Sequence, residues 1–257
     1  MLTPPEIARS LFAAGESKAR LPFGKMLLLA ILAGAYIALA GVGATAAAVT
    51  VESGSLAKLL SACVFPAGLS MVILAGSELF TGNCLMVMAL LERRITPAQL
   101  LRNWLTVYLG NAVGGAAVAA LAVYSHTASL FGDGLARSMV SIAESKAALG
   151  FGDAFLRGVL CNFLVCLAVW MAAASKRAEG KVIALFFPIL LFVLCGYEHC
   201  IANLYYLPAG AFAAAEYGME TTLTLAGCLK NLAAVTLGNL VGGAALGVGY
   251  RFAYLKE

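Results

Sequence analysis

Six long apolar runs occupy most of this 257-residue chain, and they restrict its fold more than any other feature. They lie at about 26–50, 59–91, 100–126, 152–174, 182–215 and 224–250. A helix needs about 20 mostly apolar residues to cross a bilayer, so each run is long enough. Only 12% of the residues are charged and 62% are hydrophobic, whereas soluble domains carry about 25% charged residues. We therefore predict an all-α integral membrane protein with six transmembrane helices.

The second and fifth runs are longer than one crossing requires, and a polar cluster interrupts each of them. The clusters are GSELFTGN at 76–83 and GYEHCIAN at 196–203. Polar residues at membrane depth, with apolar segments on both sides, are typical of two half-helices joined by irregular backbone. We predict that helices 2 and 5 are broken at these clusters.

The positions of Lys and Arg indicate how the chain is oriented in the membrane. In a six-helix topology, one side carries twelve of them: Arg9, Lys18, Arg20, Lys25, Arg93, Arg94, Arg102, Lys176, Arg177, Lys181, Arg251 and Lys256. The other side carries five: Lys58, Arg137, Lys146, Arg157 and Lys230. Because Lys and Arg are in excess on the cytoplasmic side of membrane proteins, we predict that both termini are cytoplasmic. We expect a multi-pass protein of the bacterial inner membrane.

An internal repeat divides the chain into two halves. The stretch NWLTVYLGNAVGG at 103–115 matches NLAAVTLGNLVGG at 231–243, an offset of 128 residues. The polar clusters also correspond, since Glu78 and Asn83 have the spacing of Glu198 and Asn203. Three crossings per repeat is an odd number, so the second copy is expected to be inverted in the membrane relative to the first. The glycines of the repeat are typical of a surface where helices pack closely.

The segments outside the repeats have simpler interpretations. Thr3-Pro4-Pro5-Glu6 has the form of a helix-capping box, so 1–25 is expected to be an amphipathic surface helix. The remaining organisation is a first repeat at 26–126, a periplasmic connecting loop at 127–151, a second repeat at 152–250 and a cytoplasmic tail at 251–257. We expect no removable signal peptide. The seven cysteines are expected to be packing residues rather than metal ligands or disulfides.

The polar clusters contain the residues with functional potential. An ionisable group at membrane depth costs at least about 2.5 kcal/mol to insert, so it normally faces the protein interior or a water-filled path. For Glu78 and Glu198 a structural role suffices, in which each carboxylate accepts hydrogen bonds at a helix break. His199 has no counterpart in the first cluster, where Leu79 stands. Its reference pKa of about 6.5 lets it exchange protons near neutral pH, which favours a role in a transport path over that of a satisfied buried imidazole.

The residues at the two breaks, ELFTGN at 78–83 and GYEHCIAN at 196–203, together with the paired Gly-Asn-x-x-Gly-Gly stretches, resemble the formate/nitrite transporter family. The resemblance covers almost the whole chain and implies an aquaporin-like inverted repeat of six helices. It also implies a homopentamer in which every protomer has its own pore, with two apolar constrictions around a central chamber. It implies that Phe65, Leu69, Leu79 and Phe80 form the cytoplasmic constriction and that Phe192 lies on the periplasmic side.

The same resemblance implies the polar residues along the path. His199 matches the central histidine, Thr81 a threonine in a gating loop, and Lys146 a lysine of the periplasmic vestibule. Asn162 and Glu198 match residues that support the histidine and the lysine. Structural polar positions are Glu78, Asn83, Asn203, Asn231 and Asn239.

A mechanism follows from these residues as an expectation. The transported species is a small monovalent anion of a weak acid, and formate is the first choice, with nitrite or hydrosulfide as alternatives. Protonating an acid of pKa about 4 at pH 7 costs about 4 kcal/mol, less than moving a carboxylate into an apolar constriction. The expected carrier of that proton is His199, so His199→Asn or His199→Phe is expected to abolish the pH dependence of uptake.

Two other classes of protein are less well supported by the residues. A water or glycerol channel shares the inverted repeat, but neither break contains the proline of an Asn-Pro-Ala motif. An intramembrane enzyme using Glu198 and His199 lacks a second histidine at ligand spacing, since His126 lies near the end of a crossing. We therefore expect a transport protein with no cofactor or metal, whose partners are the anion, a proton, the bilayer and further copies of itself.

Overall fold

The computed structural model describes residues 1–255, and within them every regular element is helical. The first half contains α1 (Pro4–Ala19), α2 (Phe23–Ala48), α3 (Gly54–Val64), α4 (Pro66–Ala75), α5 (Phe80–Asn83), η1 (Cys84–Met86), α6 (Val87–Leu91) and α7 (Pro97–Tyr124). The second half contains η2 (Thr127–Ser129), α8 (Gly134–Ala148), α9 (Phe151–Ala173), α10 (Ala178–Leu194), α11 (Cys200–Glu216) and α12 (Leu225–Tyr254). Lys256, which contributes to the predicted orientation, lies outside the described residues, as does the end of the 251–257 tail.

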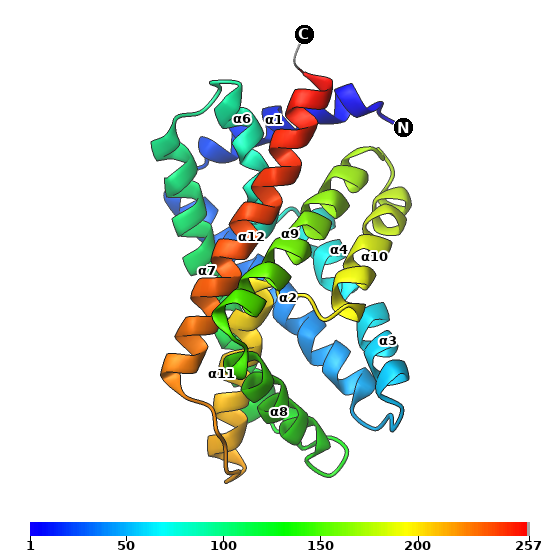
Figure 1. The fold of residues 1–257 in the computed structure, drawn as a ribbon, viewed down its shortest axis with the longest axis vertical. Helices are drawn as coiled ribbons and strands as arrows, with labels where there is room; N and C mark the ends of the chain where they lie inside the picture. Colours follow the sequence, from blue (N-terminus) through cyan, green and yellow to red (C-terminus); the bar gives the residue numbers. More distant parts are fainter. Residues whose placement is uncertain (256–257) are drawn as a thin grey trace.

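The long helices α2, α7, α9 and α12 run between the two ends of the molecule, inclined to one another (Figure 1). Five described segments are long and apolar enough to span a membrane: α2, α3 with α4, α7, α9 and α12. Helices α10 and α11 have 17 residues each and follow one another across the second break, so together they are long enough for one more crossing. The arrangement is consistent with six crossings, and it is that of a multi-pass membrane protein.

Both termini lie at the same end of the molecule, which we call the terminal face (Figure 1). Helix α1 lies across this face, and α8 lies across the opposite face. The capping box predicted at Thr3 is present, since its backbone N–H donates to Glu6 Oε2 at 2.7 Å. The segment expected as a connecting loop at 127–151 is largely helical, because Leu135, Met139 and Ala143 recur at helical spacing and bury one side of α8.

The two halves repeat each other, including α1 and α8, which sequence analysis treated as unrelated. Helix α9 begins 128 residues after α2, and α12 begins 128 residues after α7. Tyr108 and Thr236, also 128 residues apart, meet through their hydroxyls at 3.1 Å. The axis that relates the halves therefore passes close to this contact.

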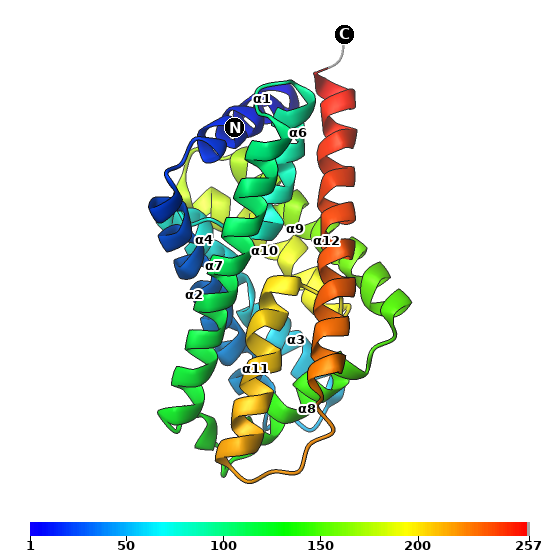
Figure 2. The same cartoon turned by 90° about the vertical axis from the view of Figure 1, so that its left-hand side faces the viewer.

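Within each half, the first and third crossings pack tightly, α7 on α2 and α12 on α9. Gly114 and Gly242 occupy equivalent positions in these contacts. A Cβ atom at Gly114 would lie 1.9 Å from the Ile31 carbonyl oxygen, and one at Gly242 would lie 2.0 Å from that of Val159. Only glycine lets the backbones approach this closely. Figure 2 shows α7 and α12 along the length of the molecule, with α11 between them.

Candidate functional site

The helix breaks are short segments of irregular backbone at the centre of the molecule. Helix α4 ends at Ala75, and α5 begins at Phe80. Helix α10 ends at Leu194, and α11 begins at Cys200. Gly76 and Gly196 have φ angles of 79° and 68°, a left-handed conformation that suits glycine. Breaks in helices 2 and 5 are thus present as predicted, although 80–83 and 200–203 are already helical.

The carboxylate of Glu78 organises the first break. Its Oε1 accepts a hydrogen bond from Lys18 Nζ at 2.7 Å, and its Oε2 accepts one from Asn83 Nδ2 at 2.7 Å. Asn83 Nδ2 also donates to Asn103 Oδ1 at 2.9 Å. Asn111 reaches the backbone of the break, donating to the Glu78 carbonyl oxygen at 2.9 Å and accepting from the Phe80 N–H at 3.0 Å. In this way the buried Glu78 carboxylate has hydrogen-bond donors, and the backbone groups that the helix break leaves unpaired have partners as well.

The second break repeats this network residue by residue. Glu198 Oε1 accepts from Lys146 Nζ at 2.8 Å, and Oε2 accepts from Asn203 Nδ2 at 2.7 Å. Asn203 Nδ2 donates to Asn231 Oδ1 at 2.8 Å. Asn239 donates to the Glu198 carbonyl oxygen at 2.9 Å and accepts from the Cys200 N–H at 2.8 Å. Both glutamates therefore hold their breaks together.

Sequence analysis missed three members of the first network, Lys18, Asn103 and Asn111. Each lies 128 residues before a member that it did name: Lys146, Asn231 and Asn239. The repeat offset was the signal that could have found them. Lys18 was assigned to a surface helix, and Lys146 to a loop, so their equivalence was hidden.

The histidine breaks the symmetry of the two networks. His199 occupies the N-cap of α11, where Nδ1 accepts a hydrogen bond from the Ala202 N–H at 3.0 Å. Its Nε2 lies 2.9 Å from Thr81 Oγ1. A ring nitrogen that accepts a hydrogen bond carries no proton, so the neutral ring holds its proton on Nε2 and donates it to the threonine. His199 thus connects the two breaks.

Thr81 is positioned from its other side as well. Asn162 Nδ2 donates to the Thr81 carbonyl oxygen at 3.2 Å and to that of Asn239 at 2.7 Å. Cys166 Sγ lies 3.3 Å from the same Thr81 oxygen. Thr81 lies inside α5, whose N-cap is Leu79, so its hydroxyl does not cap the helix. Asn162 therefore supports Thr81 rather than contacting the histidine directly.

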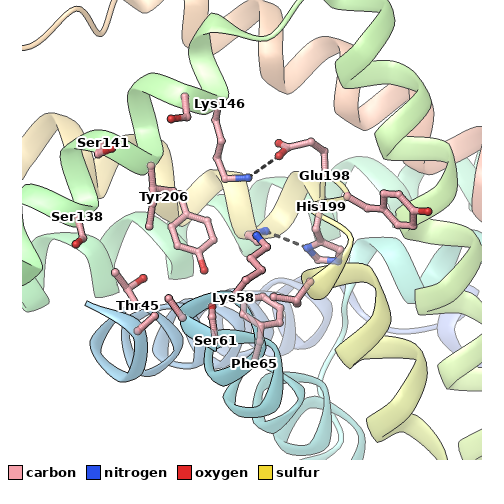
Figure 3. Close-up of a pocket in the computed structure, with 18 of the residues that line it drawn as sticks. Thr45, Lys58, Ser61, Phe65, Ser138, Ser141, Lys146, Glu198, His199 and Tyr206 are labelled. Carbon is pink, nitrogen blue, oxygen red and sulfur yellow. Dashed lines mark hydrogen bonds and ion pairs between the residues drawn. The ribbon is translucent and has the colours of Figure 1, made fainter. Parts of the chain in front are cut away.

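A cavity of about 510 Å³ extends inward from the opposite face to His199 (Figure 3). We call it the opposite-face cavity. Lys146 and Glu198 line it, and the Lys146 ammonium lies 5.3 Å from the centre of the Tyr206 ring, a cation–π contact. At its inner end the Phe65 and Phe192 rings meet edge to face with centroids 5.7 Å apart, and Phe192 stacks on His199 at 5.8 Å.

A second cavity of about 320 Å³, the terminal-face cavity, enters from the end where the termini lie. Lys18 and Glu78 line it, together with Leu69 and Leu79. Leu69 follows Phe65 by one helical turn, about 6 Å along the helix axis. No residue within 1–255 lines both cavities. Phe65 and Phe192 line the first, Leu69 and Leu79 line the second, and all four are buried members of one apolar cluster, which we call the apolar barrier.

The position of Phe65 differs from the sequence-based expectation. The resemblance implies a place in the constriction on the side of the termini, whereas Phe65 packs against Phe192 in the opposite-face cavity. The cause is the direction of the chain: α3 enters from the opposite face, so Phe65 lies nearer that face than Leu69 does. Leu69 and Leu79 lie on the terminal side as expected. Phe80 lines neither cavity, and its ring contacts Tyr108 and Trp104 at 5.1 and 6.4 Å.

No group of three or more His, Cys, Asp or Glu side chains that could hold a metal ion occurs within residues 1–255. The geometry is that of a passage: two cavities approach each other from opposite faces, and a hydrogen-bonded pair of polar side chains lies near the barrier between them.

The comparisons with known proteins agree with this geometry. The sequence profile of the family described as Formate/nitrite transporter matches residues 5–253. The chain belongs to the formate/nitrite transporter family. It is 38% identical over 275 residues to a probable formate transporter of Methanothermobacter thermautotrophicus, covering 99% of this chain and 98% of the relative.

Two solved structures share the fold. One is an FNT family ion channel, with a TM-score of 0.86 and 32% identity over 96% of this chain and 98% of that one. The other is a pentameric formate channel with formate bound, with a TM-score of 0.80 and 32% identity over 91% of this chain and 98% of that one. As a member of this family, the protein is a membrane transport protein and not an enzyme.

Proposed function

We propose that this protein is a formate channel of the bacterial inner membrane, with both termini in the cytoplasm and five protomers that each contain a pore. The observation that carries the proposal is the pair of cavities separated by an apolar barrier, with His199 and Thr81 joined beside it. The relatives named for formate support the choice of anion. Nitrite and hydrosulfide satisfy the same physical requirements.

The barrier requires the substrate to lose its charge. Phe65, Phe192, Leu69 and Leu79 are each at most 4% exposed, so they offer an ion no solvation. An unpaired carboxylate in such surroundings costs many kcal/mol, whereas protonating formate at pH 7 costs about 4 kcal/mol. Formate therefore approaches as the anion, crosses the barrier as the neutral acid and leaves as the anion and a proton.

The geometry of His199 limits how it assists this proton exchange. Its Nδ1 is engaged by the Ala202 N–H, so a second proton could enter the ring only if that N-cap hydrogen bond broke. The neutral ring can still donate Nε2–H to an oxygen of the substrate in place of Thr81. His199 then orients the substrate while water in the cavity supplies the proton.

A prediction separates hydrogen bonding from proton donation by His199. His199→Asn retains an N-cap acceptor for α11 and cannot titrate. We expect it to lower formate flux several-fold and to keep the pH profile, because the neutral acid sets that profile. Uptake into proteoliposomes from pH 5 to 8 measures both quantities. A flat profile in the variant would show that His199 itself carries the proton, the expectation from the sequence.

Thr81 permits a second prediction. Thr81→Ala removes the hydroxyl that meets His199 Nε2, so flux is expected to fall while the protein remains assembled, since Thr81 caps no helix. Thr81→Ser keeps the hydroxyl and should transport as the wild type does. Stopped-flow flux and gel filtration measure the two properties. Dissociation of Thr81→Ala on the column would assign the residue a structural role instead.

A substrate panel tests the proposed function as a whole. Proteoliposomes are assayed with formate, nitrite, hydrosulfide and glycerol at several pH values, and native mass spectrometry counts the protomers. We expect the fastest flux with formate and a pentamer. Preferred flux of nitrite or hydrosulfide would reassign the substrate, and glycerol flux without anion flux would contradict the proposal.

A further inference from the structure

The opposite-face cavity contains two cations that the mechanism above does not use. Lys58 on α3 and Arg157 on α9 line it, and both side chains are exposed. We propose that Lys58 and Arg157 form an outer anion-binding subsite, which captures small oxyanions before they reach Lys146 and His199. The inference rests on the proposed function, since it assigns a role to further residues of the same passage.

The charge balance of the cavity is the first argument. Its lining contains three cations, Lys58, Lys146 and Arg157, and one carboxylate, Glu198. Lys146 is paired with Glu198 at 2.8 Å and only 15% of its side chain is exposed, so its charge is already compensated. The uncompensated positive charge therefore comes from Lys58 and Arg157, for which no ion pair or side-chain hydrogen bond is found among residues 1–255.

The surroundings show that this is not a general property of the surface. The opposite face carries seven carboxylates: Glu52, Asp133, Glu144, Asp153, Glu198, Glu216 and Glu220. It carries five cations: Lys58, Arg137, Lys146, Arg157 and Lys230. Three of these five cations line the cavity, but only one of the seven carboxylates does. Positive charge is thus concentrated at the entrance of a face that is acidic overall.

The arrangement favours an anion between the cations. Lys58 lies within electrostatic range of Lys146 and Arg157, which repel it, and of Glu198, which attracts it. Figure 3 shows Lys58 and Lys146 extending into the cavity from opposite walls. An oxyanion that lies between the cations is attracted to each of them and offsets their mutual repulsion. The cavity walls exclude part of the surrounding water, so these charge interactions are stronger than in open water.

Hydroxyl donors complete the subsite. Ser61 lies one turn beyond Lys58 on α3, and α8 presents Ser138, Ser141 and Ser145 to the cavity. None of these hydroxyls takes part in a side-chain hydrogen bond within the described part of the chain, so all are free to donate to an anion. A site with cationic side chains and neutral hydroxyl donors can donate several hydrogen bonds to a carboxylate or another small oxyanion.

Sulfate is a suitable probe, because it keeps two charges at pH 7 and cannot cross the apolar barrier as a neutral acid. Sulfate on both sides of the membrane should inhibit formate uptake competitively. In the double variant Lys58→Gln/Arg157→Gln, the half-inhibitory concentration of sulfate is expected to rise about tenfold at low ionic strength. About tenfold is the low end of the effect that a charge-lined cleft has on the capture of ions. The difference should shrink at physiological salt, where the screening length falls to about 8 Å.

Matched variants and a binding assay make the test independent of transport. Lys230→Gln removes an exposed cation of the same face outside the cavity and should change nothing. Lys58→Arg/Arg157→Lys should retain inhibition. Sulfate binding to the purified protein, by titration calorimetry, should weaken in the double glutamine variant alone. Equal inhibition and equal binding in that variant would overturn the subsite. Sulfate binding that depends on these residues, without formate uptake by the wild type, would instead overturn the proposed function and leave the subsite standing.

Discussion

Gly242→Ala is expected to prevent α9 and α12 from packing, at a cost of about 3 kcal/mol or more, the upper end for overpacked sites. The added Cβ would lie 2.0 Å from the carbonyl oxygen of Val159 and within 3.0 Å of its Cα and carbonyl carbon. These are backbone atoms of a neighbouring crossing, so no side-chain rotation can relieve the contact. The helices must separate, and the hydrogen bonds from Asn239 to the second break would be lost with them.

Gly249→Ala is the matched control, because it lies on the same helix with no atom within 4 Å of the new Cβ. This variant should be as stable as the wild type or slightly more stable, since alanine favours helix. Thermal unfolding in detergent, followed by light scattering, compares the two. Equal unfolding temperatures for Gly242→Ala and Gly249→Ala would show that α9 and α12 are further apart than described.

The second large effect is expected for Asn239→Leu. Asn239 accepts the Cys200 N–H and donates to the carbonyl oxygens of Glu198 and Gly158. The Cys200 N–H is at the first position of α11 and has no partner inside its helix. An unsatisfied buried group costs about 1–3 kcal/mol, so loss of these bonds should destabilise the protein by about 3 kcal/mol and displace His199.

Thr236→Val is a suitable comparison for Asn239→Leu. It lies one turn earlier on α12 and removes the hydroxyl that meets the Tyr108 hydroxyl at 3.1 Å, a hydrogen bond worth about 1 kcal/mol. Asn111→Leu removes the equivalent support of the first break and should resemble Asn239→Leu in stability. If Asn239→Leu and Thr236→Val unfold at the same temperature, the second break is stabilised by packing and not by the Asn239 amide.

The sequence predicted the features that depend on local pattern. Long apolar runs predicted membrane helices because a bilayer imposes length and hydropathy. Polar clusters inside two runs predicted the breaks, because polar backbone at membrane depth needs partners. The spacing of Glu78 to Asn83 and of Glu198 to Asn203 indicated that the breaks are equivalent, and in the structure each pair is hydrogen-bonded at 2.7 Å.

Features that depend on distant parts of the chain were not predictable in this way. Lys18 and Glu78 are 60 residues apart, and Lys146 and Glu198 are 52 apart. Nothing in the neighbourhood of either lysine indicated its partner. The helix in 127–151 was missed for a different reason: α8 is amphipathic and too polar to appear as an apolar run.

By itself, the sequence determined a six-run, twice-broken membrane chain with an inverted repeat, because hydropathy and spacing are properties of neighbouring residues. Only the tertiary structure decided that Phe65 faces Phe192, that the proton of His199 lies on Nε2, and that Lys58 and Arg157 share one cavity. These facts arise where α3, α9, α10 and α11 converge. Their positions follow from close packing between crossings, which no single stretch of the sequence specifies.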